Sequence, residues 1–431
     1  MTRFVLGSLF LNCQDQIYSE EYSDFIGNRS LIESKYALDC KQPLGAMFAS
    51  LYLKLSDGYE DGTVYGYYNI PKLFGLQDTG SMEASGILQV RENPDLKLDG
   101  SGVLIGFVDT GIDYAGSIFL KQDGTTRVIA IWDQTIPAES PIRLPELPTT
   151  LENITRTPEG FLYGSEFTHE QLNAAVKMED AYEGISSRDE NGHGTALAGL
   201  AAGNVVPSEN FSGAGNELPD GSFTGAAPKA DIAMVKLKPA KNRLRAYYQI
   251  KEDAVAYQEN DIMAGVLYLV SLAKKRQQPL VICLGLGTNA GSHRGGLPLA
   301  RMLEELGSSV GITIVAGTGN ETARGHHFEG QISSENGYED VEIRVAEGEN
   351  GFFLELWANA PETYSVAIRS PNGEVIPRIY VRPGRIEVLN FALAQTRVEV
   401  SYRLSVTGTG EFLALLRFIN ITPGVWTVRV Y

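Results

Sequence analysis

The sequence predicts an α/β protein in which a parallel sheet is covered by helices on both faces. Between residues 103 and 316, short apolar runs typical of buried strands alternate with segments of helical periodicity, and this alternation favours a parallel sheet. A smaller α+β region precedes these residues, and an all-β region of short alternating runs follows them. We therefore expect three domains, at residues 1–92, 93–330 and 331–431.

Composition restricts the class of protein further. The 431 residues carry a formal charge of −17, which argues against nucleic acid as a partner, and no apolar stretch is long enough to span a membrane. The three cysteines (Cys13, Cys40 and Cys283) are odd in number and widely spaced, so we expect no disulfide framework and favour a reducing compartment. The apolar run before Cys13 is short and Asn12 is a poor signal-peptidase site, which favours a cytoplasmic over a secreted protein.

The central region contains four predicted strands and three predicted helices. The strands are expected at 103–108, 231–237, 280–284 and 312–316, and the helices at 193–203, 258–276 and 297–307. Segment 115–188 is predicted to be an insertion with a subsidiary strand pair near Arg127–Trp132 and surface helices.

The flanking regions have patterns of their own. The apolar run 45–55 is the clearest strand of the N-terminal region, and the polar, proline-containing stretch 91–100 fits a domain boundary. The C-terminal region shows seven short alternating runs and no helix, which predicts a β-sandwich or jelly roll. These runs lie at 341–345, 352–357, 364–369, 386–393, 397–406, 412–418 and 425–431.

The first of the central strands ends on a carboxylate. The run Val103–Val108 is followed directly by Asp109-Thr-Gly. In open α/β sheets, functional residues gather at the carboxyl ends of the strands, so Asp109 is a candidate for catalysis. A helix N-cap or a metal ligand at a strand tip fits this stretch, taken alone, equally well.

A histidine stands at the start of a predicted helix. Asn191-Gly-His193-Gly-Thr-Ala-Leu-Ala-Gly opens a helix of small residues, which holds the imidazole in place while its ring stays accessible. A histidine oriented by a carboxylate is what a general base requires. By itself the motif also fits a metal ligand or a structural histidine. Asp113 and Asp189 are expected to support the loops around Asp109 and His193 rather than to react.

An asparagine follows the last central strand. The predicted strand 312–316 runs into Gly317-Thr-Gly319-Asn320. An asparagine amide at such a position can donate a hydrogen bond to a developing oxyanion, an effect of about 3–4 kcal/mol. The alternative is an asparagine that only serves a left-handed turn.

Together these three motifs resemble the subtilisin-like serine proteases. Asp109, His193 and Asn320 follow one another in the order of that family. The resemblance implies a subtilisin-like parallel sheet and a protein or peptide substrate. It also implies that His193 is the general base, that Asp109 orients it, and that Asn320 stabilises the oxyanion.

The resemblance also implies a substrate-binding strand. Leu284-Gly-Leu-Gly287 stands where the family has an extended strand that pairs with the substrate, and Gly285 replaces the usual serine. Gly285, Leu286 and Gly287 would bind peptide backbone by strand addition. Gly317 and Gly319, in the asparagine motif, are expected to line the same site.

Other stretches resemble the clostridial Csp germination proteases. They are Asp123–Thr135, Gln258–Met263, and His326-His327 followed by a β region. This resemblance implies an N-terminal prodomain that acts as an intramolecular inhibitor, a jelly-roll insertion, and a location that is cytoplasmic or spore-associated. It also leads us to expect self-cleavage between about Gly86 and Glu92.

The family nucleophile is missing from this sequence. It lies in a Gly-Thr-Ser-x-Ala motif, and Gly-Thr-Ser occurs nowhere in the 431 residues. We therefore expect the chain to be inactive alone. A β domain inserted before the serine, and a chain that stops in strand pattern, favour a truncated sequence with an unfilled sheet edge. The alternatives are an inactive subtilase-like regulatory protein that binds a partner in its cleft and, more weakly, a carbohydrate-binding β domain.

No cofactor and no metal are expected. Adjacent residues His326 and His327 would point to different faces of a strand, which disfavours a shared ion, and no segment has the spacing of an EF-hand loop. Cys283 lies within a predicted buried strand and is expected to be an inert core residue.

Overall fold

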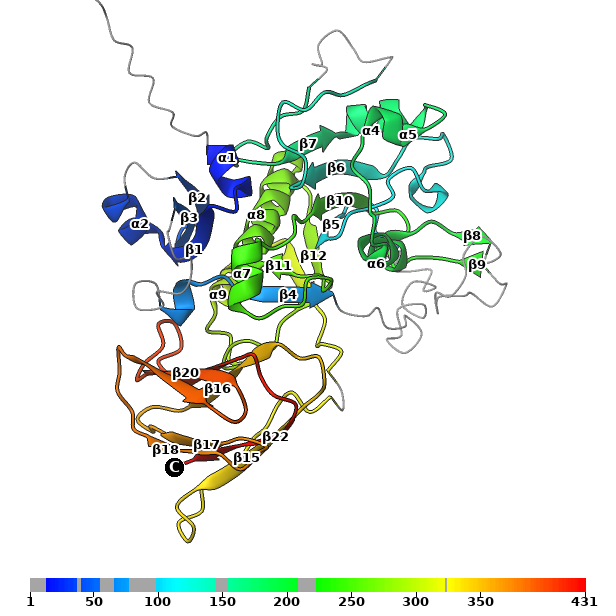
Figure 1. The fold of residues 1–431 in the computed structure, drawn as a ribbon. Helices are drawn as coiled ribbons and strands as arrows, with labels where there is room; N and C mark the ends of the chain where they lie inside the picture. The colour runs from blue at the N-terminus through cyan, green and yellow to red at the C-terminus, as the bar shows by residue number, and fades with distance from the viewer. Residues whose placement is uncertain are drawn as a thin grey trace, which may run out of the picture.

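A six-stranded sheet forms the centre of the molecule (Figure 1). The computed structural model describes residues 13–36, 40–54, 66–76, 98–144, 154–207, 222–321 and 324–431. The strand order is β14-β12-β5-β10-β6-β7, and every neighbouring pair is parallel except β6 and β7. The strands are β5 (Leu104–Asp109), β6 (Val128–Asp133), β7 (Ser165–Thr168), β10 (Asp231–Lys236), β12 (Leu280–Leu284) and β14 (Ile312–Ala316).

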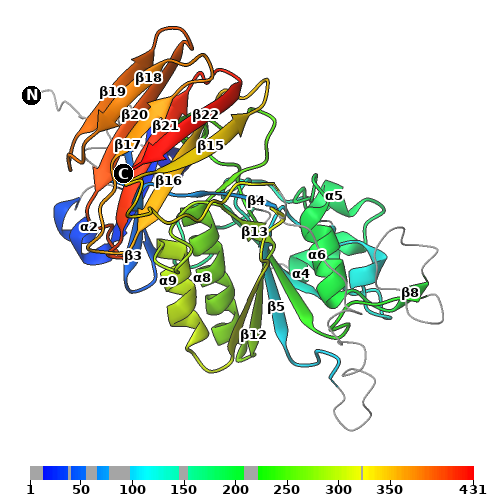
Figure 2. The ribbon, with the colours of Figure 1, turned by 90° about the horizontal axis from the view of Figure 1, so that it is seen from below.

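Alternate residues of the central strands pack into two different cores. Leu104 and Val108 of β5 join a cluster that includes side chains of α8 (Glu259–Arg276) and α9 (Pro298–Gly307). Ile105 and Phe107 face the opposite side and join a cluster with α6 (His193–Ala202). Both faces of the sheet are therefore covered, as the alternation of strands and helices predicted. Figure 2 shows α8 and α9 side by side against β12.

The predicted strands and helices of the central region are confirmed to within one residue at each end. One prediction about it was wrong. Residues 128–133 are not a subsidiary strand outside the main sheet, because β6 pairs in parallel with β10 and all six of its residues are buried.

The remaining helices of the central region are α4 (His169–Val176), α5 (Ala181–Gly184) and α7 (Asn242–Tyr247), and β8 (Val206–Pro207) pairs with β9 (Ser222–Phe223). Among the described residues, no helix is both long and apolar enough to cross a bilayer.

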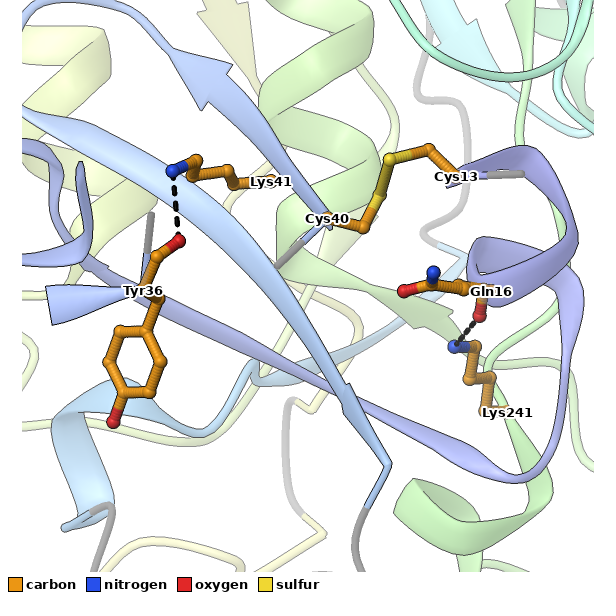
Figure 3. Close-up of a disulfide and its surroundings, with 6 residues drawn as sticks. All are labelled: Cys13, Gln16, Tyr36, Cys40, Lys41 and Lys241. Atoms are coloured by element: carbon orange, nitrogen blue, oxygen red, sulfur yellow. Dashed lines mark hydrogen bonds between the residues drawn. A yellow bond between two sulfur atoms is a disulfide. The ribbon is translucent and has the colours of Figure 1, made fainter. Parts of the chain in front are cut away.

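The N-terminal segment forms a small unit beside α8. It contains α1 (Cys13–Tyr18), α2 (Arg29–Lys35) and an antiparallel sheet of order β1-β3-β2, with β1 (Tyr22–Asn28), β2 (Cys40–Leu44) and β3 (Phe48–Lys54). A disulfide joins Cys13 of α1 to Cys40 of β2 (Figure 3). The expectation of no disulfide was therefore wrong, because folding brings two cysteines 27 residues apart within bonding distance. The count of cysteines then gives no support for a reducing compartment.

A buried polar network attaches this unit to the central sheet. The Asp24 carboxylate of β1 is fully buried and lies 2.5 Å from the Nζ of Lys241. It also accepts hydrogen bonds from the side-chain amides of Gln258 (3.0 Å) and Asn260 (3.2 Å), at the start of α8. Lys241 donates further to backbone oxygens of α1 and β1, and Figure 3 shows its bond to Gln16. Several donors thus compensate the burial of one carboxylate.

The C-terminal region contains two four-stranded antiparallel sheets that share one apolar core. Their orders are β15-β22-β17-β18 and β16-β21-β20-β19. The strands are β15 (Glu339–Val345), β16 (Gly351–Ala358), β17 (Val366–Arg369), β18 (Val375–Ile379), β19 (Ile386–Phe391), β20 (Thr396–Arg403), β21 (Phe412–Ile419) and β22 (Gly424–Val430). The sequence predicted seven of these eight strands and missed β18. That strand contains Pro377 and pairs only with β17 at the sheet edge, where a proline is tolerated.

Glu355 of β16 joins the three parts of the chain. Its carboxylate accepts hydrogen bonds from Tyr67 Oη (2.7 Å), from the backbone N–H of Gly291 (2.8 Å) and from Trp357 Nε1 (3.0 Å). The C-terminal sheets are therefore fixed to both the N-terminal segment and the loop that precedes α9.

Candidate active site

Asp109 and His193 form a hydrogen-bonded pair at the carboxyl edge of the sheet. Asp109 ends β5, and its carboxylate is fully buried. His193 is the first residue of α6, and its Nδ1 lies 2.7 Å from Asp109 Oδ1. The imidazole remains 15% exposed, so the ring is oriented from inside the protein and accessible from outside.

Two glycines allow the helix and the loop to approach this closely. A Cβ on Gly194 would lie 2.2 Å from the carbonyl oxygen of Gly111, so α6 could not begin here with a larger residue. The N–H of Gly194 instead donates to Thr110 Oγ1 (2.9 Å). The Asp109 loop and the His193 helix are thus in direct backbone contact.

Asp189 holds the same two segments together. Its Oδ1 accepts hydrogen bonds from Thr110 Oγ1 (2.8 Å) and Gly192 N (2.9 Å), and its Oδ2 accepts from the N–H (2.9 Å) and hydroxyl (2.7 Å) of Thr195. Burial raises the pKa of this carboxyl, but the hydrogen bonds, those from Thr195 first, outweigh it and hold the pKa below its usual range. Asp189 therefore accepts hydrogen bonds as an ion at the start of α6, and it supports the loop as expected.

Asp113 supports the loop from the other side. Its N–H donates to Thr195 Oγ1 (3.0 Å), and its carboxylate accepts a hydrogen bond from the hydroxyl of Tyr182. Burial, followed by the hydrogen bond to Asp113, raises the pKa of Tyr182, so the phenol stays protonated and remains a donor.

Replacing Asp189 with alanine should lower the free energy of unfolding by about 2 kcal/mol at neutral pH, because several donors lose an ionised acceptor. The pKa of Asp189 is lower in the folded than in the unfolded chain. Its contribution is therefore complete above the ordinary carboxyl pKa and is lost as the pH falls through the lowered value. Urea denaturation of wild type and D189A at several pH values tests this. A difference that stays constant down to strongly acidic pH would contradict the assignment.

Gly285 lies directly against the Asp109–His193 pair. A Cβ at this position would be 2.9 Å from His193 Cε1 and 3.1 Å from Asp109 Oδ2. Any side chain here would have to displace the imidazole or its neighbours. The second oxygen, Asp109 Oδ2, is buried and has no hydrogen-bond partner among the described residues.

A three-stranded antiparallel sheet continues from Gly285. Its order is β11-β4-β13, with β4 (Leu73–Leu76) between β11 (Tyr257–Gln258) and β13 (Leu286–Gly287). The predicted substrate-binding residues Leu286 and Gly287 therefore pair with Leu76 and Gly75 of the N-terminal segment. Sequence reasoning missed β4 and β11. The short apolar run after Ile70 indicates a strand at β4. A strand of four residues is too short for its pattern to predict which strand it pairs with.

The predicted asparagine motif lies at the same edge of the sheet. Gly317 follows β14, and its N–H donates to the carbonyl of Leu284 (3.3 Å), the residue before Gly285. Gly319 has a positive φ of 100°, which turns the chain, and the side chain of Asn320 is exposed. Asn320 therefore lies three residues after Gly317, whose backbone hydrogen bond ties this motif to the segment that contains Gly285.

β14 is the outermost strand, and its surface is open. It pairs with β12 on one side, and no other strand of the described residues joins it on the other. Val315 is 50% exposed although it belongs to a strand of the central sheet. Neighbouring Val310 is fully exposed. Apolar strand residues at a free edge are unusual in a folded protein and indicate a surface suited to further polypeptide.

Within the described residues, neither a metal-ligand cluster nor a reactive thiol accompanies the Asp109–His193 pair. The described residues contain no group of three or more His, Cys, Asp or Glu side chains that could hold an ion. His326 pairs with Glu321 while His327 stacks on His293, so the adjacent histidines face different partners. Burial, and then the charge of Asp109, raise the pKa of Cys283 to about 11, so this thiol is protonated at neutral pH.

The fold and this pair define a class of protein: an α/β protein with a buried aspartate that orients a histidine at a helix start, as in serine hydrolases. The family model described as Peptidase_S8, Subtilase family, matches residues 100–349, and the chain belongs to this family. The Subtilisin-like protease SBT3.8 of Arabidopsis thaliana is 32% identical over 137 residues. The structure of the Clostridium perfringens CspB protease superposes with a TM-score of 0.63 at 26% identity, over 81% of this chain. The chain spans 16% of the plant protease and 64% of the CspB chain.

Proposed function

We propose that this chain is part of a serine endopeptidase that hydrolyses peptide bonds in extended polypeptides. The observation that carries the proposal is the 2.7 Å contact between Asp109 Oδ1 and His193 Nδ1 in a member of the subtilase family. Resemblance to clostridial germination proteases extends the proposal to activation of a proenzyme in spore germination.

The proposed roles follow from the chemistry of the groups. With Nδ1 bound to Asp109, His193 presents Nε2 to take a proton from an attacking hydroxyl, and the buried carboxylate stabilises the imidazolium that forms. Asn320 would donate its amide to the oxygen of the tetrahedral intermediate. Protonation of the leaving amine by His193 then completes the transfer.

In this proposal the nucleophile comes from sequence other than these 431 residues, because they contain no Gly-Thr-Ser. We propose that polypeptide carrying the serine continues the sheet from the free edge of β14. The exposed apolar residue Val315 supports this location. In this scheme residues 331–431 are a jelly-roll insertion. An inactive regulatory protein is the second candidate, but the family relationship favours the protease.

The N-terminal segment is proposed to be a prodomain that inhibits its own catalytic domain. β4 lies antiparallel between β11 and β13, which is how an extended peptide would bind by strand addition. Leu76 is opposite Leu286, and Gly285 is the next residue toward His193. A peptide bound in this register would therefore have its next residue opposite Gly285, beside the base.

Maturation is expected to cut the chain within a few residues after Leu76. This position lies upstream of the stretch between Gly86 and Glu92 where the sequence led us to expect the cut, and both stretches are outside the residues that the structure describes. N-terminal sequencing of protein expressed with the coding sequence beyond codon 431 locates the cut, and a fluorophosphonate label identifies the serine. An intact Met1 terminus in a labelled, active enzyme would contradict the prodomain proposal, and a stop codon directly after Tyr431 would contradict the protease proposal.

A further inference from the structure

We propose that Glu259 binds the backbone of the polypeptide substrate, at the residue just before the stretch that pairs with β11, and that this substrate residue cannot be proline. The inference rests on the proposed function, because it takes β4 as the occupant of the substrate site. β4 and β11 run antiparallel, and their pairing includes Leu73 opposite Gln258. Lys72 and Glu259 are the next residues on the two strands, so they come opposite each other.

Glu259 binds both polar backbone groups of Lys72. Its backbone N–H donates to the carbonyl oxygen of Lys72 (3.0 Å), and its side-chain Oε2 accepts a hydrogen bond from the N–H of Lys72 (3.1 Å). In an ordinary antiparallel pair, backbone groups would make both of these bonds. Glu259 is the first residue of α8, where its carbonyl oxygen points along the helix, so the carboxylate supplies the acceptor instead.

The carboxylate of Glu259 is held in place from a second direction. Its Oε1 accepts a hydrogen bond from the backbone N–H of Leu299 at the start of α9 (3.0 Å), and the side chain is completely buried. Burial raises the pKa of Glu259, and the Lys72 ammonium and the two N–H donors oppose this effect. Because α9 fixes one oxygen, the other is oriented in advance toward whichever peptide lies in the site.

The side chain of Lys72 makes its hydrogen bonds elsewhere. Its Nζ donates to the carbonyl oxygens of Tyr67 and Ile70, both at 2.6 Å, within the N-terminal segment itself. The hydrogen bonds between Lys72 and Glu259 therefore involve only the backbone of Lys72.

An acceptor that binds a backbone N–H distinguishes proline from every other residue, because proline alone lacks that donor. A substrate with proline at this position would leave Glu259 Oε2 as a buried acceptor without a partner, which is unfavourable. The sequence of this chain agrees with such a restriction, since its proline is at position 71, one residue before the bound N–H.

A quenched fluorogenic peptide with the sequence of residues 69–84 tests the proposal on enzyme expressed with the coding sequence beyond codon 431. N-methyl-lysine in place of Lys72 keeps the side chain and removes the N–H. We expect it to lower kcat/KM at least tenfold, mainly through KM, because this bond is made equally in the ground state and the transition state. A peptide with alanine in place of Pro71 is the matched control and should keep the kcat/KM of the parent peptide.

Glu259→Gln tests whether this loss acts through the carboxylate. The amide has one acceptor oxygen for two N–H donors, so E259Q should cleave the parent peptide less efficiently. N-methylation should then have little further effect, because the interaction that it removes is already weakened. Equal kcat/KM for the lysine and N-methyl-lysine peptides on wild-type enzyme would overturn the proposal, as would an undiminished loss on N-methylation in E259Q. If thermal melting shows that E259Q is unfolded, the two peptides on wild-type enzyme decide.

An enzyme that cleaves none of these peptides would contradict the protease proposal, and the contact is then tested without catalysis. A site for a sequence-specific protease, inserted between residues 84 and 85, allows the 431-residue chain to be cut after it has folded. Surface plasmon resonance then measures how fast the N-terminal segment dissociates. Lys72→Pro should dissociate at least tenfold faster than Lys72→Ala, which keeps the N–H. Equal dissociation rates would overturn the role of Glu259 as a backbone acceptor.

Discussion

Replacing His193 with alanine should lower kcat about 10⁶-fold in a form of the enzyme that carries the nucleophilic serine. The imidazole would be the only group positioned to take the hydroxyl proton, and its loss leaves the oxyanion donors and substrate binding alone. Asp109→Asn should lower kcat about 10⁴-fold, because the amide favours the wrong tautomer of His193. Turnover of a chromogenic peptide, normalised to folded protein, measures both effects.

His169 offers a matched control for this experiment. It is the first residue of α4, as His193 is of α6, and its Nε2 lies 3.0 Å from the carbonyl oxygen of Thr126, away from Asp109. H169A should keep kcat within a few-fold of wild type. If H193A also stayed within tenfold of wild type, His193 would not be the general base.

Replacing Lys241 with methionine should lower the free energy of unfolding by about 3–5 kcal/mol, because it leaves the buried Asp24 carboxylate without its cation. The aliphatic part of the side chain is retained, so lost packing contributes little. Restoring neutrality in K241M/D24L should recover most of the loss. Urea denaturation followed by tryptophan fluorescence gives the free energies.

Lys54 provides the comparison on the same unit. Its ion pair with Glu21 has a similar length, 2.7 Å, but both side chains are more than 60% exposed. K54M should therefore change the free energy of unfolding far less than K241M does, because solvent screens an exposed ion pair. Equal effects of K241M and K54M would show that burial of the Asp24 network does not contribute to stability.

The central sheet and the Asp109–His193 pair were accessible to prediction from the sequence. Strands buried on both faces give continuous apolar runs, as in β5 and β12, and α8 is long enough to show its period. Asp109 and His193 can be recognised in the sequence because Asp109 ends an apolar strand and His193 begins a helix. Their meeting follows from topology, since the carboxyl ends of parallel strands share one edge.

The features that the sequence did not predict depend on pairing between distant residues. The Cys13–Cys40 disulfide requires α1 to lie beside β2, and no local sequence pattern predicts that these two elements are neighbours. β4 and β13 are each too short to have a period, and only their register shows that they are partners. The packing of Gly285 against His193 also arises from the tertiary structure, because a glycine after a strand is common in any turn.

The position of β4 between two later strands has a consequence for the order of folding. Leu76 and Leu286 pair although about 200 residues separate them in the chain. Contacts of such long sequence separation are formed late and slowly, because the entropy of closing the loop is lost before the pairing compensates it. The N-terminal segment is synthesised first, so it is available as a template when β11 and β13 leave the ribosome. Chains that lack the N-terminal segment would have to fold β11 and β13 without β4 between them. We expect such chains to accumulate in partly folded states.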